Sequence, residues 1–538
     1  MQFHIQSTVF GQFVRLVSRN KIFRYPDEID PSLWAKAVGQ DAQSPQPEQA
    51  LRSVDDGRGK GEQKSAGVAD GASDVLVVDW YGPADPEDPQ NWPDVLKHLI
   101  AFQMCLLNFA VYIASSIYVP GESSLIEEFG VSEIVATLGL SLFTFGYGIG
   151  PMLWSPLSEM PVFGRSRIFV GTLFAFIIFQ LPVGLAPNVA VFLVFRFLTG
   201  FCGSPCLATG SGTLNDIYPP TQVPYLLLIW QSAGVLGPVF GPVIGGYLAP
   251  AKGWRWTIWL FTILCSFVLV AMFFLLPETS ADNILYNRAR RLRKATGNDR
   301  LRSQTEVDSA HHGTKDHLML LARAFTITFT EPIILFVDLY AGLLYGVLFI
   351  WFESFPIVFG GIYGFTIGQQ GLVFLSILVF ASISVAMFLL WINKRLVPMM
   401  LSKAFKPEMV LPPAFVGGFA LPICLFWFGW TLRESVHWIV PIIGSGLFGI
   451  GVTTLFNSVY TYIDIVYARY AASVFAGAAL FRALLGSAFP LFARSLFYNI
   501  GVGPGNSLLG GLAVLFIPIP YIIHRYGERI RGWSKHAE

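Results

Sequence analysis

The sequence predicts an all-α membrane protein with twelve transmembrane helices in two halves of six. Its mean hydropathy is +0.55, and only 13% of its 538 residues are charged, whereas soluble proteins carry about 25% charged residues. Twelve apolar runs reach the roughly 20 residues that a helix needs to cross a bilayer. A charged stretch in the middle of the chain divides these runs into two groups of six.

The apolar runs are separated by polar turns. In the first half they cover about 98–119, 134–157, 168–186, 189–212, 225–249 and 256–277, and in the second half about 332–357, 368–392, 411–430, 436–461, 470–497 and 506–524. We therefore expect an N-terminal region (1–97), a six-helix half (98–277), a central loop (278–331), a second six-helix half (332–524) and a tail (525–538).

The N-terminal region is expected to be largely disordered. Residues 39–73 are rich in Gln, Gly, Ser, Asp and Lys, so they bury too little apolar surface to offset the loss of chain entropy. The N-terminus lacks the basic, apolar and small-residue order of a signal peptide. The first spanning helix is therefore expected to direct insertion.

The distribution of Lys and Arg predicts that both termini and the central loop are cytoplasmic. The even-numbered connections and the tail hold clusters of basic residues, whereas the odd-numbered ones hold only Lys252, Arg255 and Arg433. The first outer loop is acidic, because it contains Glu122, Glu127, Glu128 and Glu133.

Several classes of partner and chemistry are not expected. The net charge of +1 argues against nucleic acid. The five cysteines lie in apolar runs without zinc-like spacing, so neither disulfides nor a metal are expected. The chain has no nucleotide-binding Gly-x-x-x-x-Gly-Lys-Ser/Thr loop, no His-Glu-x-x-His and no Gly-x-Ser-x-Gly motif. We therefore expect no cofactor, no use of ATP and no enzyme activity.

The fifth apolar run contains a repeated glycine and proline pattern. Four glycines spaced by three or four residues share one helix face, which allows another helix to approach closely; they are Gly234, Gly237, Gly241 and Gly245. Pro238 and Pro242 remove two backbone donors and favour a bend. Tight packing without a functional bend is the alternative.

This pattern resembles the antiporter motif of the major facilitator superfamily, in its fungal drug:proton antiporter branch with twelve spans. The run 150–167 resembles the loop signature of that superfamily, although Glu159 stands where most members have Asp. The segments 196–203, 277–280 and 290–297 are similar to further motifs, and the resemblance covers about 75–525. It implies the major facilitator fold and export driven by protons.

The connection between the second and third helices is a candidate cytoplasmic gate. Glu159 and Arg165 are close enough to pair across a tight turn that Gly164 permits. The resemblance implies that this pair, with Arg167, helps to latch one conformation. The alternative is that the two arginines only enforce topology.

Three charged residues within the apolar runs are candidates for proton coupling. Arg196 lies inside the fourth run, where an arginine costs about 2.5–3.5 kcal/mol on insertion scales, and the resemblance implies the coupling role. Asp338 and Glu353 lie on one broad face of the seventh run, about 60° and roughly 22 Å apart. A low-dielectric setting disfavours their charged forms, so they can take up and release a proton. A static hydrogen bond for Arg196, and exposure of Glu353 at the outer surface, are the alternatives.

Polar and aromatic residues in several runs are candidates to line a substrate cavity. They are Gln103, Asn108, Gln231, Tyr345, Phe349, Phe352, Asn457, Tyr460 and Arg482. Arg482 could pair with Asp338 or anchor backbone carbonyls. Buried amides often bridge helices instead of binding ligands, and this alternative stays open.

These features favour a proton-coupled exporter of small amphipathic molecules: drugs, toxins or an endogenous metabolite. Importers and facilitators of the same superfamily form the second hypothesis, and a membrane-embedded receptor or enzyme the third. We expect a monomer in the plasma membrane, with the vacuolar membrane as the alternative, whose partners are protons, lipid and a small-molecule substrate.

Overall fold

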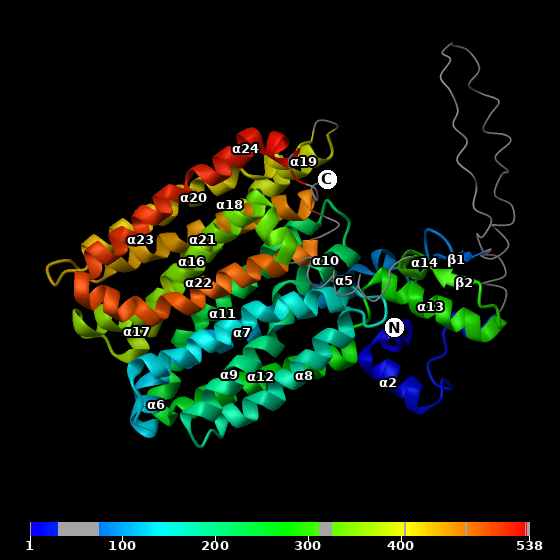
Figure 1. Ribbon diagram of the computed structural model, residues 1–538, viewed down its shortest axis with the longest axis horizontal. Helices are drawn as coiled ribbons and strands as arrows, with labels where there is room; N and C mark the ends of the chain where they lie inside the picture. Colours follow the sequence, from blue (N-terminus) through cyan, green and yellow to red (C-terminus); the bar gives the residue numbers. More distant parts are fainter. Residues whose placement is uncertain are drawn as a thin grey trace, which may run out of the picture.

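The structure is a bundle of long helices with a smaller charged assembly at one end (Figure 1). It is a computed structural model that describes residues 2–30, 75–310, 325–402, 405–467, 471–532 and 534. Within these residues, twelve helices are long and apolar enough to cross a membrane. The predicted fold class, an all-α membrane protein with twelve spans, is therefore confirmed.

The six spans of the first half follow one another with short connections. They are α5 (Asp94–Ser116), α7 (Glu133–Glu159), α8 (Arg165–Gly184), α9 (Val189–Gly203) continued by α10 (Thr209–Ile217), α11 (Val223–Lys252) and α12 (Trp254–Leu275). The short α6 (Glu122–Phe129) follows α5. The fourth span breaks between α9 and α10 because Pro205 lacks the backbone N–H that a continuous helix needs.

The second half repeats the layout. Its spans are α16 (Pro332–Phe355), α17 (Ile367–Val373) continued by α18 (Leu375–Trp391), α20 (Pro412–Thr431), α21 (Ile439–Val466), α22 (Ala471–Ile500), and α23 (Val502–Phe516) continued by α24 (Pro518–Arg531). The short α19 (Val397–Met400) follows α18.

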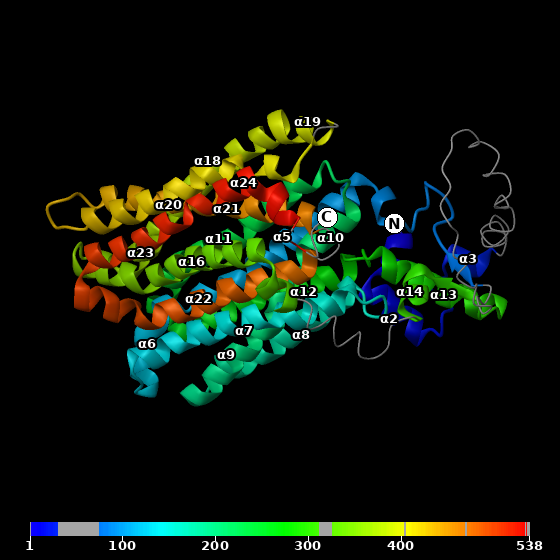
Figure 2. The ribbon, with the colours of Figure 1, turned by 45° about the horizontal axis from the view of Figure 1, so that its top comes forward.

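Burial separates central helices from helices at the rim. In the most apolar part of the α16 span, 83% of residues are buried, whereas the share is 33% for α12. Across the two halves, α7 packs on α22 (Figure 2), and α11 packs on α17. The side chains that line the interface between the halves therefore come mainly from these helices and α16.

The N-terminal segment and the central loop form a collar at one end of the bundle, which we call the terminal face; the other end is the opposite face. The collar contains α1 (Gln2–Ser7), α2 (Val9–Val17), α3 (Pro26–Ile29), α13 (Ala281–Thr296) and α14 (Gln304–Ala310). Strands β1 (Leu76–Val78) and β2 (Leu301–Ser303) pair in parallel, with Leu76 opposite Leu301. Both chain ends lie on this side of the bundle (Figure 1).

The collar differs from the expected, largely disordered N-terminal region. Residues 2–30 form helices, and residues 75–97 contain β1 and the start of α5. Ion pairs account for this order, because Arg288 of α13 lies 2.8 Å from a carboxylate oxygen of Asp85. The segment 39–73, for which disorder was predicted, lies outside the described residues.

Candidate functional site

A small cavity lies between the two halves, near the middle of the bundle. Its volume is about 30 Å³, which is room for a water molecule but not for a drug-sized ligand. Five residues predicted from the sequence line it: Asn108, Gln231, Tyr345, Tyr460 and Arg482. Phe349 lines an adjoining space together with Tyr345 and Arg482.

Arg482 of α22 is the cation of this cavity. Its guanidinium lies 5.3 Å from the ring centre of Tyr345, 5.2 Å from that of Tyr460 and 5.8 Å from that of Phe456. Its Nε donates to the carbonyl of Ala478 at 3.2 Å. Aromatic faces attract cations, so the rings hold Arg482 in place without a direct ion pair.

Asp338 of α16 is fully buried, and its two carboxylate oxygens have no hydrogen-bond partner in the described part of the chain. Of the two alternatives for Arg482, the structure shows the contact with a backbone carbonyl; no ion pair with Asp338 forms, although the two charges are close enough to interact. An unpaired buried carboxylate is costly. Asp338 is therefore a candidate to carry a proton.

Three predicted cavity residues lie elsewhere. Gln103 donates from α5 to the carbonyl of Ala271 in α12 at 3.4 Å, so it bridges two helices of the same half. Asn457 donates to the carbonyl of Thr453, one turn earlier in α21. Phe352 packs on Phe374 at 5.3 Å between ring centres. None of the three lines the central cavity.

The cavity also contains aromatic residues that the sequence did not single out. The hydroxyls of Tyr112 and Tyr345 lie 2.8 Å apart and join α5 to α16, and thus the two halves. Trp230, Phe456 and Phe475 complete the aromatic lining. Tyr112 lies one helical turn after Asn108 in the first apolar run, and this spacing is the signal in the sequence that could have identified it.

Arg196 of α9 is fully buried and has no carboxylate directly against it among the described residues. Its Nε donates to the carbonyl of Gly139 at 2.9 Å, and its Nη1 to that of Ala114 at 3.0 Å. The guanidinium lies 4.7 Å from the ring centre of Phe143 and 4.9 Å from that of Tyr118. Arg196 therefore ties α9 to α5 and α7.

Glu353 is buried near the opposite face and does not reach the outer surface, since only 1% of it is exposed. One carboxylate oxygen accepts from Arg494 Nε at 2.7 Å, and the other from the hydroxyl of Thr137 at 3.4 Å. Arg494 also lies 2.7 Å from Glu133 of α7. Arg494 thus joins a buried carboxylate of the second half to an acidic residue of the first.

Glu122, which the sequence placed in an acidic outer loop, is buried beside this group. Its Oε1 lies 2.9 Å from the hydroxyl of Tyr118, and its charge is close enough to interact with those of Glu353 and Arg196. The hydroxyl of Tyr118 also contacts the carbonyl of Ala136. We call Tyr118, Glu122, Arg196, Glu353 and Arg494 the charged network.

The glycine face of α11 packs directly on α5. A Cβ atom added at Gly237 would lie 2.6 Å from Cβ of Tyr112, and one at Gly245 would lie 2.2 Å from the carbonyl oxygen of Ile117. At Gly241 it would meet the hydroxyl of Ser116, and at Gly234 the side chain of Asn108. Only glycine permits this approach of the two backbones.

The prolines of the same motif leave backbone carbonyls without their helical partners. Pro242 has no N–H, so the carbonyl of Pro238 lacks the hydrogen bond that a helix would provide. Ser116 of α5 donates its hydroxyl to this carbonyl at 3.1 Å. The neighbouring helix therefore satisfies the acceptor that the proline orphans.

At the terminal face, Arg165 makes an ion pair with Asp216 of α10 at 2.6 Å, and the charge of Glu159, its predicted partner, is also close enough to interact with it. Sequence spacing favoured Glu159 because it lies just across the turn, but Asp216 comes within reach only through the packing of α10. Gly164 has φ +73°, and an added Cβ would lie 2.5 Å from the carboxylate of Glu278.

Glu278 occupies the N-terminus of α8. Its oxygens accept from the backbone N–H groups of Arg165 and Ser166 at 2.9 and 3.2 Å. A carboxylate at a helix N-terminus satisfies free N–H groups and interacts favourably with the helix dipole. Arg167, the fourth predicted gate residue, points away from this group and donates to Gln12 of α2 at 2.7 Å.

Two hydrogen-bonded pairs among the described residues join the two halves near the terminal face. Asn215 of α10 donates to Asp464 of α21, at 3.2 and 3.4 Å from its two carboxylate oxygens. Tyr225 and Asn393 add an exposed contact of 3.4 Å. With contacts at both ends and a cavity of only about 30 Å³ between them, the structure represents a closed state.

In the collar, burial would raise the pKa of Asp85, but the hydrogen bond and charge of Arg288 outweigh it and hold that pKa below its usual value.

No group of three or more His, Cys, Asp or Glu in the described residues could hold a metal ion. The central cavity offers aromatic and cationic contacts, and the buried carboxylates of Asp338 and Glu353 are candidates for proton exchange.

Comparison with known proteins agrees with this architecture. Residues 104–490 match the Major Facilitator Superfamily. The chain is 42% identical to Transporter mfs1 of Schizosaccharomyces pombe over 86% of this chain and 89% of that protein. It is 41% identical to Fluconazole resistance protein 1 of Saccharomyces cerevisiae, over 89% and 88% of the two chains.

A solved structure is similar in fold. The proton:xylose symporter XylE, bound to 6-bromo-6-deoxy-D-glucose, superposes with a TM-score of 0.57 over 81% of this chain and 96% of that one. The two sequences are only 15% identical, so the likeness concerns the arrangement of helices alone.

Proposed function

The chain belongs to the major facilitator superfamily of membrane transporters, and from this premise we propose that it is a proton-coupled exporter of small amphipathic molecules. The observation that carries the proposal is the charged network, in which buried Glu353 and Arg494 link the halves at the opposite face. The relative named for fluconazole resistance supports a drug or toxin as the cargo.

The mechanism uses the protonation of Glu353. When Glu353 is charged, it holds Arg494 at 2.7 Å, and Arg494 reaches across to Glu133 of the other half. A proton on Glu353 removes the charge that orients Arg494, so the contact between the halves weakens at this end. Each protonation state thus favours a different access state, which coupling requires.

Glu122 is a second proton carrier in this proposal. The hydroxyl of Tyr118 has one hydrogen but faces two oxygen acceptors, on Glu122 and Ala136. All three groups are satisfied together when Glu122 is protonated and donates its own hydrogen to Tyr118. Arg196, which contacts the ring of Tyr118, is then placed to sense that proton.

The substrate site is the central cavity, which must expand when the halves separate. Tyr345, Tyr460 and Phe456 would present aromatic faces to an apolar or cationic substrate once Arg482 moves aside. Gln231 and Asn108 supply hydrogen bonds from the first half. Few polar groups and many rings favour low specificity, since apolar pockets discriminate weakly between similar shapes.

The orientation and setting complete the proposal. The terminal face is cytoplasmic and the opposite face external, as the distribution of basic residues favours. The protein works in the plasma membrane as a monomer, without nucleotide and without enzyme activity. The six-helix halves (98–277 and 332–524) rock about the central cavity, and Glu278, Arg165 and Asp216 stiffen the cytoplasmic end of the first half.

The test is transport by the purified protein in vesicles with an imposed pH gradient, using fluorescent amphipathic compounds and azoles as substrates. We expect uphill movement that collapses when a protonophore is added. Downhill movement that ignores the gradient would identify a facilitator instead. Glu353→Gln should bind substrate but lose the response to the gradient, whereas the exposed Glu434→Gln serves as the matched control and should behave as wild type.

A further inference from the structure

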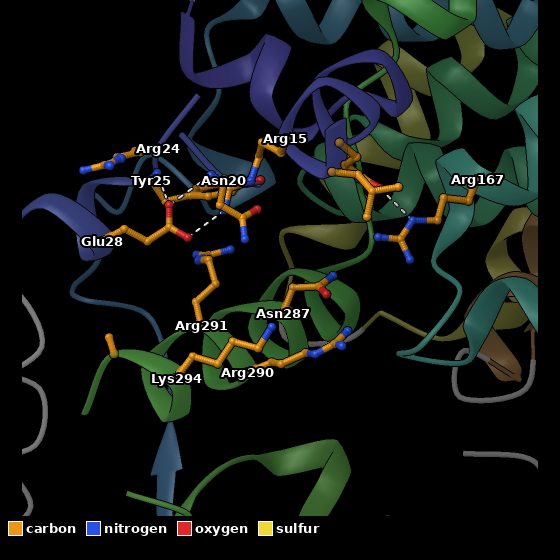
Figure 3. Close-up of a pocket in the computed structure, with 13 residues that line it drawn as sticks. Arg15, Asn20, Arg24, Tyr25, Glu28, Arg167, Asn287, Arg290, Arg291 and Lys294 are labelled. Carbon is orange, nitrogen blue, oxygen red and sulfur yellow. Dashed lines mark hydrogen bonds and ion pairs between the residues drawn. The ribbon is translucent and has the colours of Figure 1, made fainter. Parts of the chain in front are cut away.

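A second, larger cavity lies outside the helical bundle. It is an open cavity with a volume of about 550 Å³, lined by α2, α3, the start of α8 and α13 at the terminal face. Figure 3 shows the side chains around it, contributed by the N-terminal segment on one side and by α13 on the other. Six basic residues line it, namely Arg15, Arg24, Arg167, Arg290, Arg291 and Lys294, together with one carboxylate, that of Glu28.

Two of the six basic residues are paired with carboxylates in the described part of the chain. Arg15 pairs with Glu28 at 2.6 Å, and Arg291 pairs with Asp27 and Glu87 at 2.9 and 3.1 Å. These contacts fix two guanidinium groups in position.

The other four basic residues are available to a ligand. No ion pair joins Arg24, Arg290 or Lys294 to a carboxylate in the described part of the chain. Arg167 donates only to the uncharged side chain of Gln12 and to the carbonyl of Val162. A concave site with this charge suits a ligand that carries several negative charges, and guanidinium groups match phosphate oxygens in a bidentate geometry.

The cavity adjoins the part of α2 that packs on the end of the α12 span. Phe10, just inside α2, packs on Phe273 and Phe274 at the end of the α12 span, with ring centres 6.0 and 4.9 Å apart. Leu16 of α2 lines the cavity and is 78% exposed, and Phe13 on the same helix is 57% exposed. A short helix with exposed apolar side chains at this level suits contact with acyl chains.

We propose that this cavity binds the headgroup of an anionic phospholipid with more than one phosphate, drawn from the leaflet at the terminal face. The phosphates contact Arg167, Arg290 and Lys294, and the acyl chains lie against Leu16 and Phe13. The bound headgroup bridges α2, α8 and α13, so it secures the collar to the bundle. The proposal does not depend on which substrate the transporter carries.

The experiment measures lipid binding by the full-length protein in nanodiscs. One preparation contains phosphatidylcholine alone, one adds phosphatidylserine, and one adds phosphatidylinositol bisphosphate; a fourth contains phosphatidylcholine with soluble inositol trisphosphate in the buffer. Native mass spectrometry counts bound lipid, and hydrogen exchange follows α2 and α13. We expect retained bisphosphate lipid and slower exchange in the third preparation, with little effect of phosphatidylserine.

Paired variants separate a specific site from general attraction. Arg290→Gln with Lys294→Gln should weaken bisphosphate-lipid binding by roughly tenfold or more, since each basic residue near an anionic surface contributes about 1 kcal/mol. Both side chains are exposed, so the fold should persist. Lys394→Gln with Arg395→Gln removes the same charge from exposed positions after α18 and should leave binding unchanged.

Three outcomes would overturn the proposal. Equal losses in the two double variants would show general electrostatic attraction. Equal protection by phosphatidylserine would show that several phosphates are not needed. Slower exchange with soluble inositol trisphosphate but none with the lipid would identify a free polyanion as the ligand.

Discussion

At the opposite face the halves are joined by charge, whereas at the terminal face they are joined by an amide. Arg494 of the second half lies 2.7 Å from both Glu353 and Glu133. At the other end, Asn215 donates to Asp464, and the strong pair Arg165–Asp216 stays within the first half. In the proposed mechanism, protonation of Glu353 acts on the opposite end, while the terminal end is held by a hydrogen bond to the carboxylate of Asp464.

The largest effect on transport is expected from removing Arg494, the cation that joins the halves at the opposite face. Arg494→Gln leaves buried Glu353 without its partner, which costs about 1–3 kcal/mol. We expect loss of uphill transport and a lower melting temperature, measured by vesicle uptake and by thermal unfolding in detergent. Arg433→Gln changes the same charge at an exposed position near that end. Unchanged gradient-driven transport in Arg494→Gln would remove this residue from coupling.

Gly→Ala substitutions at the contact between α5 and α11 should destabilise the protein more the closer they lie to the opposite face. At Gly245 an added methyl group would lie 2.2 Å from a backbone oxygen, whereas at Gly234 it meets the movable side chain of Asn108 at 2.8 Å. Gly245→Ala should therefore destabilise the protein by about 1–3 kcal/mol, and Gly234→Ala by less. Gly171→Ala, with nothing within 4 Å, is the control in the same thermal measurement. Equal losses at Gly245 and Gly171 would contradict the close packing.

A smaller effect is expected at the terminal end. Asn215→Ala removes the donor to Asp464 and should favour opening on that side by about 1 kcal/mol, or roughly fivefold in population. Spin-label distances between the ends of α10 and α21 would measure it. Tyr225→Phe removes an exposed contact at the same face and should change little. A larger change of the α10–α21 distance in Tyr225→Phe than in Asn215→Ala would show that Tyr225, and not Asn215, holds the terminal end closed.

The smallest effect concerns the collar and its pH dependence. The lowered pKa of Asp85 means that its contact with Arg288 stabilises the collar above the ordinary carboxyl value of about 3.9. This contribution is lost as pH falls through the folded-state pKa. Hydrogen exchange of β1 should therefore accelerate below about pH 4, and in Asp85→Asn it should be fast already at neutral pH. Equal protection of the variant and the wild type at pH 7 would count against this role.

The sequence predicted the helices well because hydropathy and glycine spacing are local properties. The twelve spans and the close face of α11 follow from short windows of residues. Partners were harder to predict, since Arg494 and Glu353 are far apart in sequence and meet only through the packing of α16 on α22.

The sequence-based predictions that differ from the structure do so for physical reasons. Glu122 follows the first span and appeared to belong to a solvated loop, but the fold of α6 buries it beside Tyr118. Arg165 was assigned to its sequence neighbour Glu159, whose charge does interact with it, but the ion pair is made with Asp216 of α10. Amides were ambiguous from the start: Asn108 lines the cavity and also bridges α5 and α11 through the carbonyl of Trp230, whereas Gln103 bridges helices away from the cavity.

The hydrogen bond from Ser116 to the carbonyl of Pro238 has a mechanical consequence. A helix normally satisfies its backbone hydrogen bonds internally, so it can slide or rotate past a neighbouring helix and lose only side-chain contacts. Here the carbonyl of Pro238 in α11 accepts its hydrogen bond from Ser116 of α5. Relative movement of the two helices would break this bond and leave a polar carbonyl unsatisfied in an apolar environment. We therefore expect α5 and α11 to move together as one rigid unit. Conformational change within the first half must then occur in its other helices.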